Sequence, residues 1–525
     1  MRRPVAWVGA AAGGMLTVSC VGVSAPPAAS ARPATAPAVG AEFRSHPPIP
    51  EPPRPYQPPV PVITPLPNGM GLIVVEQHEA NIVDAELTVR GGPGAWPDDS
   101  SRAVILMLDS ALHGTKSYSE ARLFGAMSAG LFEIHGRDSN ASIGFSLRGE
   151  ASSFPLAIPT FSEVVLAPTF PKEQVEAIKS NLLEGAAPGV EKPDPIAWRN
   201  LMGAVYGPDH PYTWATVVRD PHLAQLSRDD LVRIRRTRMD PAQTTLVVVG
   251  DVDPERVRRL VEARFGDWRA DPSRRDPPPL PPPSPSGARL IAVDRPGAPL
   301  ATVFYGGLVP FGGADQTAAD MVARDLIGGL PSSALATTLR EELGAVSKAN
   351  TRFWNRQTDA FMWWSGGVVP GRLGPALAAL DARVRELRAR DAEPAELAIA
   401  RVAARRGLPA WMETTTAIAR SFTEVIETRD VRAAAEYFPR LVARIESVPW
   451  AEVRAALPDP GAVKVVVVGD LASLTVPLAS LGWGPIEVHD AEGRLVRTLD
   501  QPRRGDSAQP RQRGRSDGTS AVNHL

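Results

Sequence analysis

The pattern of apolar and polar positions along this chain predicts a strand, a turn and a helix at residues 245–265. Residues 245–249 form a continuous apolar run, typical of a strand covered on both faces, and Gly250 ends it. Asp253 suits the N-cap of a following helix with Pro254 at its first position. That helix is expected to bury one face, formed by residues at helical spacing: Val257, Leu260, Val261 and Phe265.

A second unit of the same kind lies near the other end of the chain. Residues 463–470 read Val-Lys-Val-Val-Val-Val-Gly-Asp, and an apolar segment follows at 471–481. Two similar units about two hundred residues apart indicate an internal duplication, because a solenoid needs more copies. Length alone suggests roughly three or four domains. We instead expect an α/β protein with two larger halves, each made of a sheet and its helices.

Shifts in composition set the expected boundaries. Residues 271–287 contain DPPPLPPPSPSG, which cannot form a helix or a central strand and predicts a semi-rigid extended linker. The two halves are therefore expected at 62–270 and 288–497. The Pro/Ala-rich stretch 25–61 and the polar end 498–525 have no apolar periodicity, so both are predicted to be disordered.

The first residues predict export. Residues 1–24 begin with two arginines after the Met and continue with a short apolar run, the pattern of a signal peptide rather than a spanning helix. Cys20 is the only cysteine, and with residues 16–19 before it the site resembles that of bacterial lipoproteins. Cleavage near Ala25 or after Ala31 would instead remove Cys20. We expect a bacterial cell-envelope protein, periplasmic or an outer-membrane lipoprotein, without disulfides.

The charge balance excludes some classes of partner. The chain has 57 Lys and Arg against 58 Asp and Glu, a formal net charge of -1. Nothing in this balance indicates binding to nucleic acid or to an anionic membrane surface. Contact with a membrane is expected only through a lipid on Cys20.

Short motifs in a fixed order resemble the pitrilysin/insulinase family of metallopeptidases. Residues 66–75 read Leu-Pro-Asn-Gly-Met-Gly-Leu-Ile-Val-Val, an Asn-Gly turn before a β-branched run. The motifs His-Pro-Tyr at 210–212, Leu-Ser-Arg-Asp-Asp-Leu at 226–231 and Phe-Gly-Asp-Trp at 265–268 follow in the order of the family. The resemblance covers residues 62–270 well and the rest loosely. It implies two duplicated halves that face each other as a clamshell.

The zinc motif of the family is missing from the place where the resemblance puts it. The family helix reads as an inverted His-x-x-Glu-His before a Gly-Thr turn. Registered on Gly114 and Thr115, its histidines fall on Ile105 and Asp109, and its glutamate base falls on Leu108. Catalytic zinc needs three protein ligands and an open water position, and Ile and Leu offer no lone pair. The resemblance therefore implies a peptidase fold with no catalytic residue and no zinc cofactor.

A rebuilt metal site is one alternative. Asp109 and His113 are four residues apart on the predicted helix, so they share a face. The glutamate ligand of the family's downstream helix falls on Gly185 or, with a shift of one residue, on Glu184. The competing interpretation makes His113 a structural residue near the C-terminal dipole of its helix.

The second half offers one candidate for substrate binding. Members of the family carry an Arg and a Tyr there that hold the substrate backbone near the zinc. In this chain Arg340 occupies the Arg position, whereas Val346 replaces the Tyr. Arg340 is therefore either a substrate-binding residue or a surface residue beside Glu341 and Glu342.

Together these observations predict a non-catalytic subunit of a two-chain zinc peptidase. It would help to hold peptide substrates beside a zinc-bearing subunit of the same family. A stand-alone envelope protein that binds peptides or scaffolds other proteins is the alternative. A third hypothesis is an active metallopeptidase with a rebuilt metal site, and only that one requires a metal in this chain.

Overall fold

The computed structural model describes residues 55–92, 101–139, 141–185, 191–214, 216, 222–274, 276–356, 358–429 and 431–500. The chain divides into a unit at Met1–Pro55 and a unit at Tyr56–Leu525, and the elements below belong to the second. The predicted signal peptide and Cys20 lie outside the described residues, as do most of the Pro/Ala-rich stretch and most of the polar end.

The first sheet has six strands in the order β1-β2-β6-β3-β5-β4. Its strands are β1 (Val62–Pro65), β2 (Gly71–Glu76), β3 (Val83–Arg90), β4 (Phe132–Asp138), β5 (Ser142–Gly149) and β6 (Thr244–Gly250). All seven residues of β6 are buried, and the strand pairs in parallel with β2 and antiparallel with β3. The apolar run therefore forms a strand covered on both faces, as its composition predicts.

The second sheet has seven strands in the order β13-β12-β7-β11-β8-β10-β9. Its strands are β7 (Leu290–Asp294), β8 (Ala301–Val309), β9 (Val346–Asn355), β10 (Ala360–Val368), β11 (Lys464–Gly469), β12 (Ile486–His489) and β13 (Leu495–Leu499). The central strand β11 lies in the second apolar run of the sequence, and all five valines of that run are buried.

The two sheets share one strand topology, which confirms the internal duplication. The order β2-β6-β3-β5-β4 in the first sheet matches β7-β11-β8-β10-β9 in the second, strand for strand along the chain. In each of these two five-strand orders the first pair is parallel and the other three pairs are antiparallel. Strand β1 extends the first sheet, and β12 and β13 extend the second.

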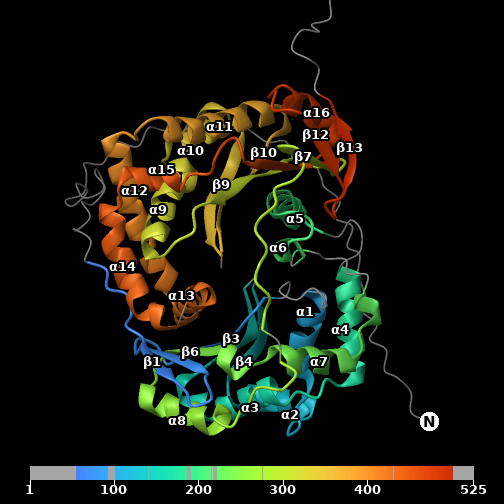
Figure 1. Ribbon diagram of the computed structural model, residues 1–525, viewed down its shortest axis with the longest axis vertical. Coiled ribbons are helices and arrows are strands. Elements are labelled where there is room, and N and C mark those ends of the chain that lie inside the picture. The colour runs from blue at the N-terminus through green and yellow to red at the C-terminus, as the bar shows by residue number, and fades with distance from the viewer. Residues whose placement is uncertain are drawn as a thin grey trace, which may run out of the picture. The chain divides into compact units, whose positions relative to one another are not determined.

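Helices cover the first sheet on the side away from the second (Figure 1). They are α1 (Ser101–Ser110), α2 (Glu120–Ala129), α3 (Phe154–Leu166), α4 (Lys172–Gly185), α7 (Arg228–Arg238) and α8 (Pro254–Phe265). The side chain of Asp253 caps α8 by accepting a hydrogen bond from the backbone N–H of Arg256 at 2.7 Å. Val257, Val261 and Phe265 are buried and Leu260 is half-buried against the same core, so the predicted apolar face is confirmed.

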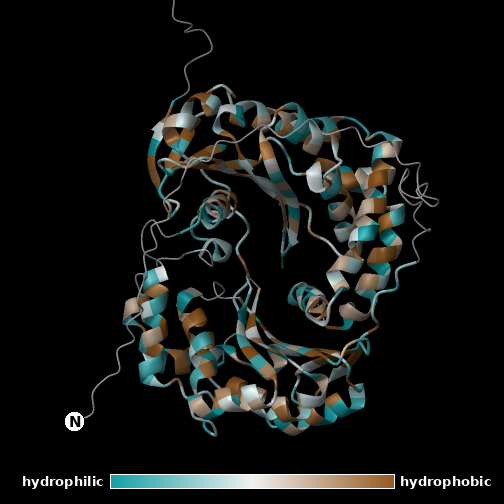
Figure 2. Cartoon of the chain, turned by 180° about the vertical axis from the view of Figure 1, so that it is seen from behind, coloured by the Kyte–Doolittle hydropathy of each residue, from teal (hydrophilic) through white to brown (hydrophobic). Residues whose placement is uncertain are grey.

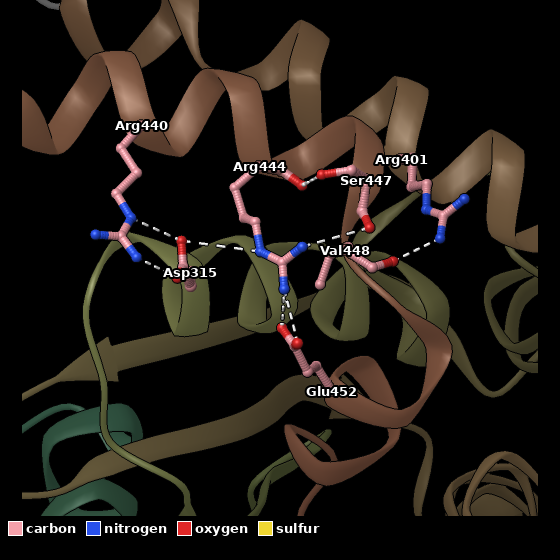
Figure 3. Close-up of polar contacts among 7 residues, drawn as sticks. All are labelled: Asp315, Arg401, Arg440, Arg444, Ser447, Val448 and Glu452. Atoms are coloured by element: carbon pink, nitrogen blue, oxygen red, sulfur yellow. Dashed lines mark hydrogen bonds and ion pairs between the residues drawn. The ribbon is translucent and has the colours of Figure 1, made fainter.

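The second sheet is covered in the same way by a larger set of helices. They are α9 (Ala314–Arg324), α10 (Ala334–Thr337), α11 (Leu373–Ala389), α12 (Pro394–Gly407), α14 (Ala434–Ser447), α15 (Trp450–Ala455) and α16 (Leu471–Ala479). Figure 3 shows the ion pairs that join three of them. Asp315 of α9 accepts two hydrogen bonds from Arg440 of α14, at 3.0 and 2.6 Å. Arg444 of α14 donates to both carboxylate oxygens of Glu452 in α15 at 2.7 Å.

Two helices are exchanged between the halves. Helix α5 (Pro193–Tyr206) precedes β6 in the chain but packs on β8 and β11 of the second sheet. Helix α13 (Thr415–Thr428) precedes β11 but packs on β3 and β6 of the first sheet. Since β3 and β6 correspond to β8 and β11, the exchange obeys the symmetry of the duplication. Figures 1 and 2 show both helices between the two sheets.

The proline-rich stretch runs beside α5. Residues 271–287 contain no helix or strand among the residues that the structure describes there. The N–H groups of Ser284 and Ser286 donate to the carbonyl oxygens of Tyr206 and Ala204, each at 3.0 Å. These bonds satisfy carbonyl groups at the C-terminal end of α5.

Within the described part of the chain, no helix is both long enough and apolar enough to cross a membrane.

Candidate functional site

The helix at the position of the zinc motif is packed as a core element. Helix α1 lies against β4, and Leu108, which takes the place of the glutamate base, is only 2% exposed. Gly136 of β4 lies directly opposite, since a Cβ atom there would come within 2.9 Å of the Leu108 Cβ. Ile105 is half-buried on the same helix. The position of the general base therefore serves helix-to-sheet packing.

Asp109 is the one motif position with a possible metal ligand. Burial raises the pKa of its half-buried carboxyl group, Asp138 raises it further, and His113 acts in the opposite direction. With a raised pKa, a metal ion has to compete with a more tightly held proton at this carboxyl group. Among the residues that the structure describes, no three His, Cys, Asp or Glu side chains are grouped so as to hold a metal ion.

His113 makes local contacts at the end of the motif segment. It lies in the 3-10 turn η2 (Ala111–His113), and its Nδ1 is 2.6 Å from Oε1 of Glu120. The other oxygen of Glu120 accepts a hydrogen bond from Gln174 of α4 at 2.8 Å. Glu184, the proposed third ligand, is exposed near the end of α4 and accepts a hydrogen bond from Ser180 at 3.4 Å. These contacts tie η2 to α2 and α4.

Arg340 also makes only short-range contacts in this structure. It is exposed on the short π-helix η7 (Thr338–Glu342) and donates to the carbonyl oxygen of Pro331 at 3.2 Å and to Glu341 at 3.0 Å. Val346, in the place of the family tyrosine, is 8% exposed at the start of β9.

A cavity of about 380 Å³ lies between the first sheet and α13. Its charged walls include Glu86 of β3 and Arg137 of β4, whose closest side-chain atoms are 3.8 Å apart. Glu427 of α13 accepts a hydrogen bond from Ser139 at 2.8 Å and another from Ser142. The exchanged helix therefore supplies one wall of this cavity and is hydrogen-bonded to the β4–β5 hairpin.

The carboxyl groups around α13 hold their protons more tightly than usual. Burial raises the pKa of Glu86 and of Glu427. It also raises the pKa of Glu424 to about 7, and the neighbouring Glu427 adds to the effect. The Glu424 side chain is reached by solvent inside the cavity, although protein surrounds it. Near neutral pH the carboxyl group of Glu424 can therefore both donate and accept hydrogen bonds, which suits peptide amides.

A second cavity, of about 540 Å³, lies beside the first along α13 and adjoins it. Both cavities are lined by four of the same residues: Trp354, Arg420, Glu424 and Glu427. Aromatic side chains from β9 and from the helices around it form much of the second wall: Phe353, Trp354, Trp411, Tyr437 and Phe438. The wall of this cavity therefore combines aromatic rings with many polar and charged side chains.

Sequence reasoning did not point to α13. A signal was present, because Arg420, Glu424 and Glu427 recur at helical spacing and so form one charged stripe on an otherwise uncharged helix. The sequence does not show that this stripe faces a cavity, since the facing residues come from β3, β4 and β9.

Comparison with known proteins agrees with this fold. Residues 225–403 match the family described as the peptidase M16 inactive domain. The crystal structure of a peptidase M16 inactive domain from Pseudomonas fluorescens superposes with a TM-score of 0.69 at 16% identity, over 78% of this chain and 98% of that one. That of a protease from Helicobacter pylori gives 0.68 at 17% identity, over 79% and 100%.

A curated relative is similar over part of its length. The zinc protease PqqE of Helicobacter pylori is 24% identical to this chain over 231 residues. The match covers 43% of this chain and 52% of the relative, so it spans about half the length of that protease.

The chain is a homologue of the M16 peptidases, the pitrilysin/insulinase family, with a degenerate zinc motif. The resemblance that the sequence motifs indicated is thereby confirmed. Its mixed α/β fold, with two duplicated halves, is the fold of M16-like peptidases.

Proposed function

We propose that this chain is a non-catalytic M16 subunit that helps to hold peptide substrates beside a zinc-bearing subunit of the same family. The observation that carries the proposal is the packing of Leu108 against Gly136. A side chain without a lone pair fills the place of the general base, so zinc-dependent hydrolysis has no local basis in this chain.

The interior that remains supports a binding role. Two adjoining cavities lie between the sheets and α13, and together they present protonatable carboxyl groups, guanidinium groups and aromatic rings. Peptides offer amides, charges and apolar side chains, so each kind of group has a counterpart.

The partner is proposed from the family. The similarity to a protein named a zinc protease makes a family member with an intact motif the expected partner. We further propose that the chain is exported to the cell envelope and held there by a lipid on Cys20, as its first residues suggest.

A second candidate is a stand-alone envelope protein that binds peptides or scaffolds other proteins. The observation in its favour is that both halves, and therefore both cavities, belong to one chain. Peptide binding would then need no catalytic partner.

The test is a native pull-down of the tagged full chain from detergent-solubilised envelope, followed by mass spectrometry. We expect a near-stoichiometric M16 protein with an intact His-x-x-Glu-His, and peptide hydrolysis by the pair but not by this chain alone. Recovery of the chain alone, still able to bind peptides, would instead favour the stand-alone protein. Peptide hydrolysis by the pure chain would overturn both.

A further inference from the structure

A further cavity, of about 230 Å³, lies where α13 ends beside the first sheet (Figure 1). Its walls come from β1, β2, β3 and β6 of that sheet, from the 3-10 turn η5 (Pro241–Gln243) and from the residues that follow α13. At about 30 Å³ for each water molecule, this space equals roughly seven waters. The cavity can therefore hold a small molecule or ion, but not a long peptide.

The charged side chains of this cavity are all arginines, among the described residues that line it. They are Arg90 of β3, Arg429 at the end of α13, and Arg432. By contrast, Arg440 and Arg444 on the outer helices are paired with carboxylates (Figure 3). Guanidinium groups gathered around one space without a facing carboxylate favour an anion as its occupant.

Arg429 and Arg90 are held by the protein and still have N–H groups to donate. Nη2 of Arg429 donates to the carbonyl oxygen of Gly312, which follows β8 in the second half. Its Nε is buried and has no partner among the described residues, and no hydrogen bond to one of them occupies Nη1. Arg90 uses Nε, which donates to Gln243 at 3.1 Å. The remaining N–H groups of both side chains can therefore pair with the oxygens of an anion.

Two threonine hydroxyls add neutral donors to the same wall. Thr88 of β3 and Thr245 of β6 are directly opposite each other in neighbouring strands, so both side chains lie on one face of the sheet. Both line the cavity, and neither hydroxyl is hydrogen-bonded to a residue that the structure describes. Gly71 is the next residue in this row, and a Cβ atom there would lie 3.0 Å from Oγ1 of Thr245. The glycine therefore leaves room beside this hydroxyl.

We propose that this cavity binds a small dianion. The required chemistry is shared by a phosphate group and a short dicarboxylate, because each carries two negative charges and several acceptor oxygens. Arg90 and Arg429 pair with the charges, and Thr88 and Thr245 donate their O–H groups to oxygens of the same anion. Because Arg429 also binds Gly312, the anion links the first sheet, the end of α13 and the second half. This site goes beyond the peptide-holding role and does not depend on it.

Isothermal titration calorimetry of the full chain tests the site, with inorganic phosphate and with malonate in separate titrations at constant ionic strength. We expect saturable binding of one anion per chain, and the two titrations show which class of dianion fits. Arg429→Gln should weaken binding about tenfold, and Thr88→Val about threefold. The matched controls Arg259→Gln and Thr498→Val, at exposed positions of α8 and β13, should bind as the native chain does.

Thermal unfolding distinguishes a lost site from a lost fold. Either anion should raise the unfolding temperature of the native chain, and should raise that of folded Arg429→Gln less. Thr88→Val keeps the size of the side chain, so it serves as the test if Arg429→Gln does not fold. If neither dianion binds, or if both variants bind it as tightly as the native chain, the cavity is not an anion site and the inference is wrong. The peptide-holding role stands in either case, because the pull-down tests it separately.

Discussion

Glu427 of α13 and Ser139 after β4 are joined by a hydrogen bond of 2.8 Å, although 288 residues separate them in the chain. Ser142 donates to the same carboxylate. At the other end of α13, Thr415 and Thr416 donate to the buried carboxylate of Asp84 at 2.5 and 3.0 Å. Both ends of the exchanged helix are therefore fixed to the first sheet by side chains.

Removal of the Glu427 carboxylate should loosen this attachment. Glu427→Ala leaves two serine hydroxyls without their acceptor, so we expect the free energy of unfolding to fall by about 1–3 kcal/mol. Urea denaturation measures the change. Glu413→Ala, at an exposed position before α13, is the control and should stay within about 0.5 kcal/mol of the native chain. Equal effects of the two variants would show that the bond to Ser139 does not hold the helix.

Glu424 should make stability depend on pH. Its folded pKa of about 7 lies above its ordinary value of 4.5, so the folded chain keeps a proton that the unfolded chain has already lost. The protonated Glu424 contributes to the free energy of unfolding in full below pH 4.5, and this contribution is lost as the pH rises through 7.

Glu424→Gln mimics the neutral carboxyl group, so it should be more stable than the native chain only at high pH. At about pH 8 we expect it to be more stable than the native chain by on the order of 1 kcal/mol, after allowance for screening by water in the cavity. At about pH 5 the two should be equal. Thermal unfolding at both pH values is the measurement, and the same difference at each would contradict the account.

Thr351→Val should change stability and peptide binding in opposite directions. The native hydroxyl is buried without a partner, so its replacement by a methyl group is expected to raise the free energy of unfolding by about 1 kcal/mol. Peptide binding in the cavity of about 540 Å³ should weaken at the same time, because one hydrogen-bonding group of its wall is gone. Thermal unfolding and the fluorescence anisotropy of a labelled peptide, measured on one preparation, check both signs. A variant that is less stable and binds as before would show that the hydroxyl serves the fold alone.

Gly136→Ala should disturb the packing of the motif helix. Its new Cβ would lie 2.9 Å from the Cβ of Leu108, which is too close for either backbone to remain in place. We expect a loss of about 1–3 kcal/mol in urea denaturation. Gly125→Ala is the control, since a Cβ there meets nothing within 4 Å and the helix α2 should gain about 0.5–1 kcal/mol. If Gly136→Ala leaves the free energy of unfolding unchanged, α1 is free to shift.

The sequence predicts the regular elements of each half well. The apolar run at 245–249 becomes the central strand β6, and Asp253 caps α8, because both depend on residues close together in the chain. The two closing units also reveal the duplication, since each repeats the same local pattern.

The exchange of α5 and α13 could not be predicted in the same way. Most residues of α5 are buried, but the sequence of the helix does not indicate which of the two sheets encloses it. The cavities depend on the same long-range choice, because Ser139, Trp354 and Glu424 meet only once α13 lies on the first sheet. Lipidation of Cys20, a role of Arg340 in substrate binding and the halves expected at 62–270 and 288–497 stay predictions.

The zinc content of the pure full chain tests the central claim most directly. The chain would be dialysed against zinc, passed over a desalting column and analysed by plasma mass spectrometry, with peptide hydrolysis measured on the same sample. We expect zinc far below one equivalent and no hydrolysis, because Ile105 and Leu108 offer no ligand or base. One zinc per chain together with hydrolysis would show that Asp109 and His113 belong to a working site, and the non-catalytic account would be wrong.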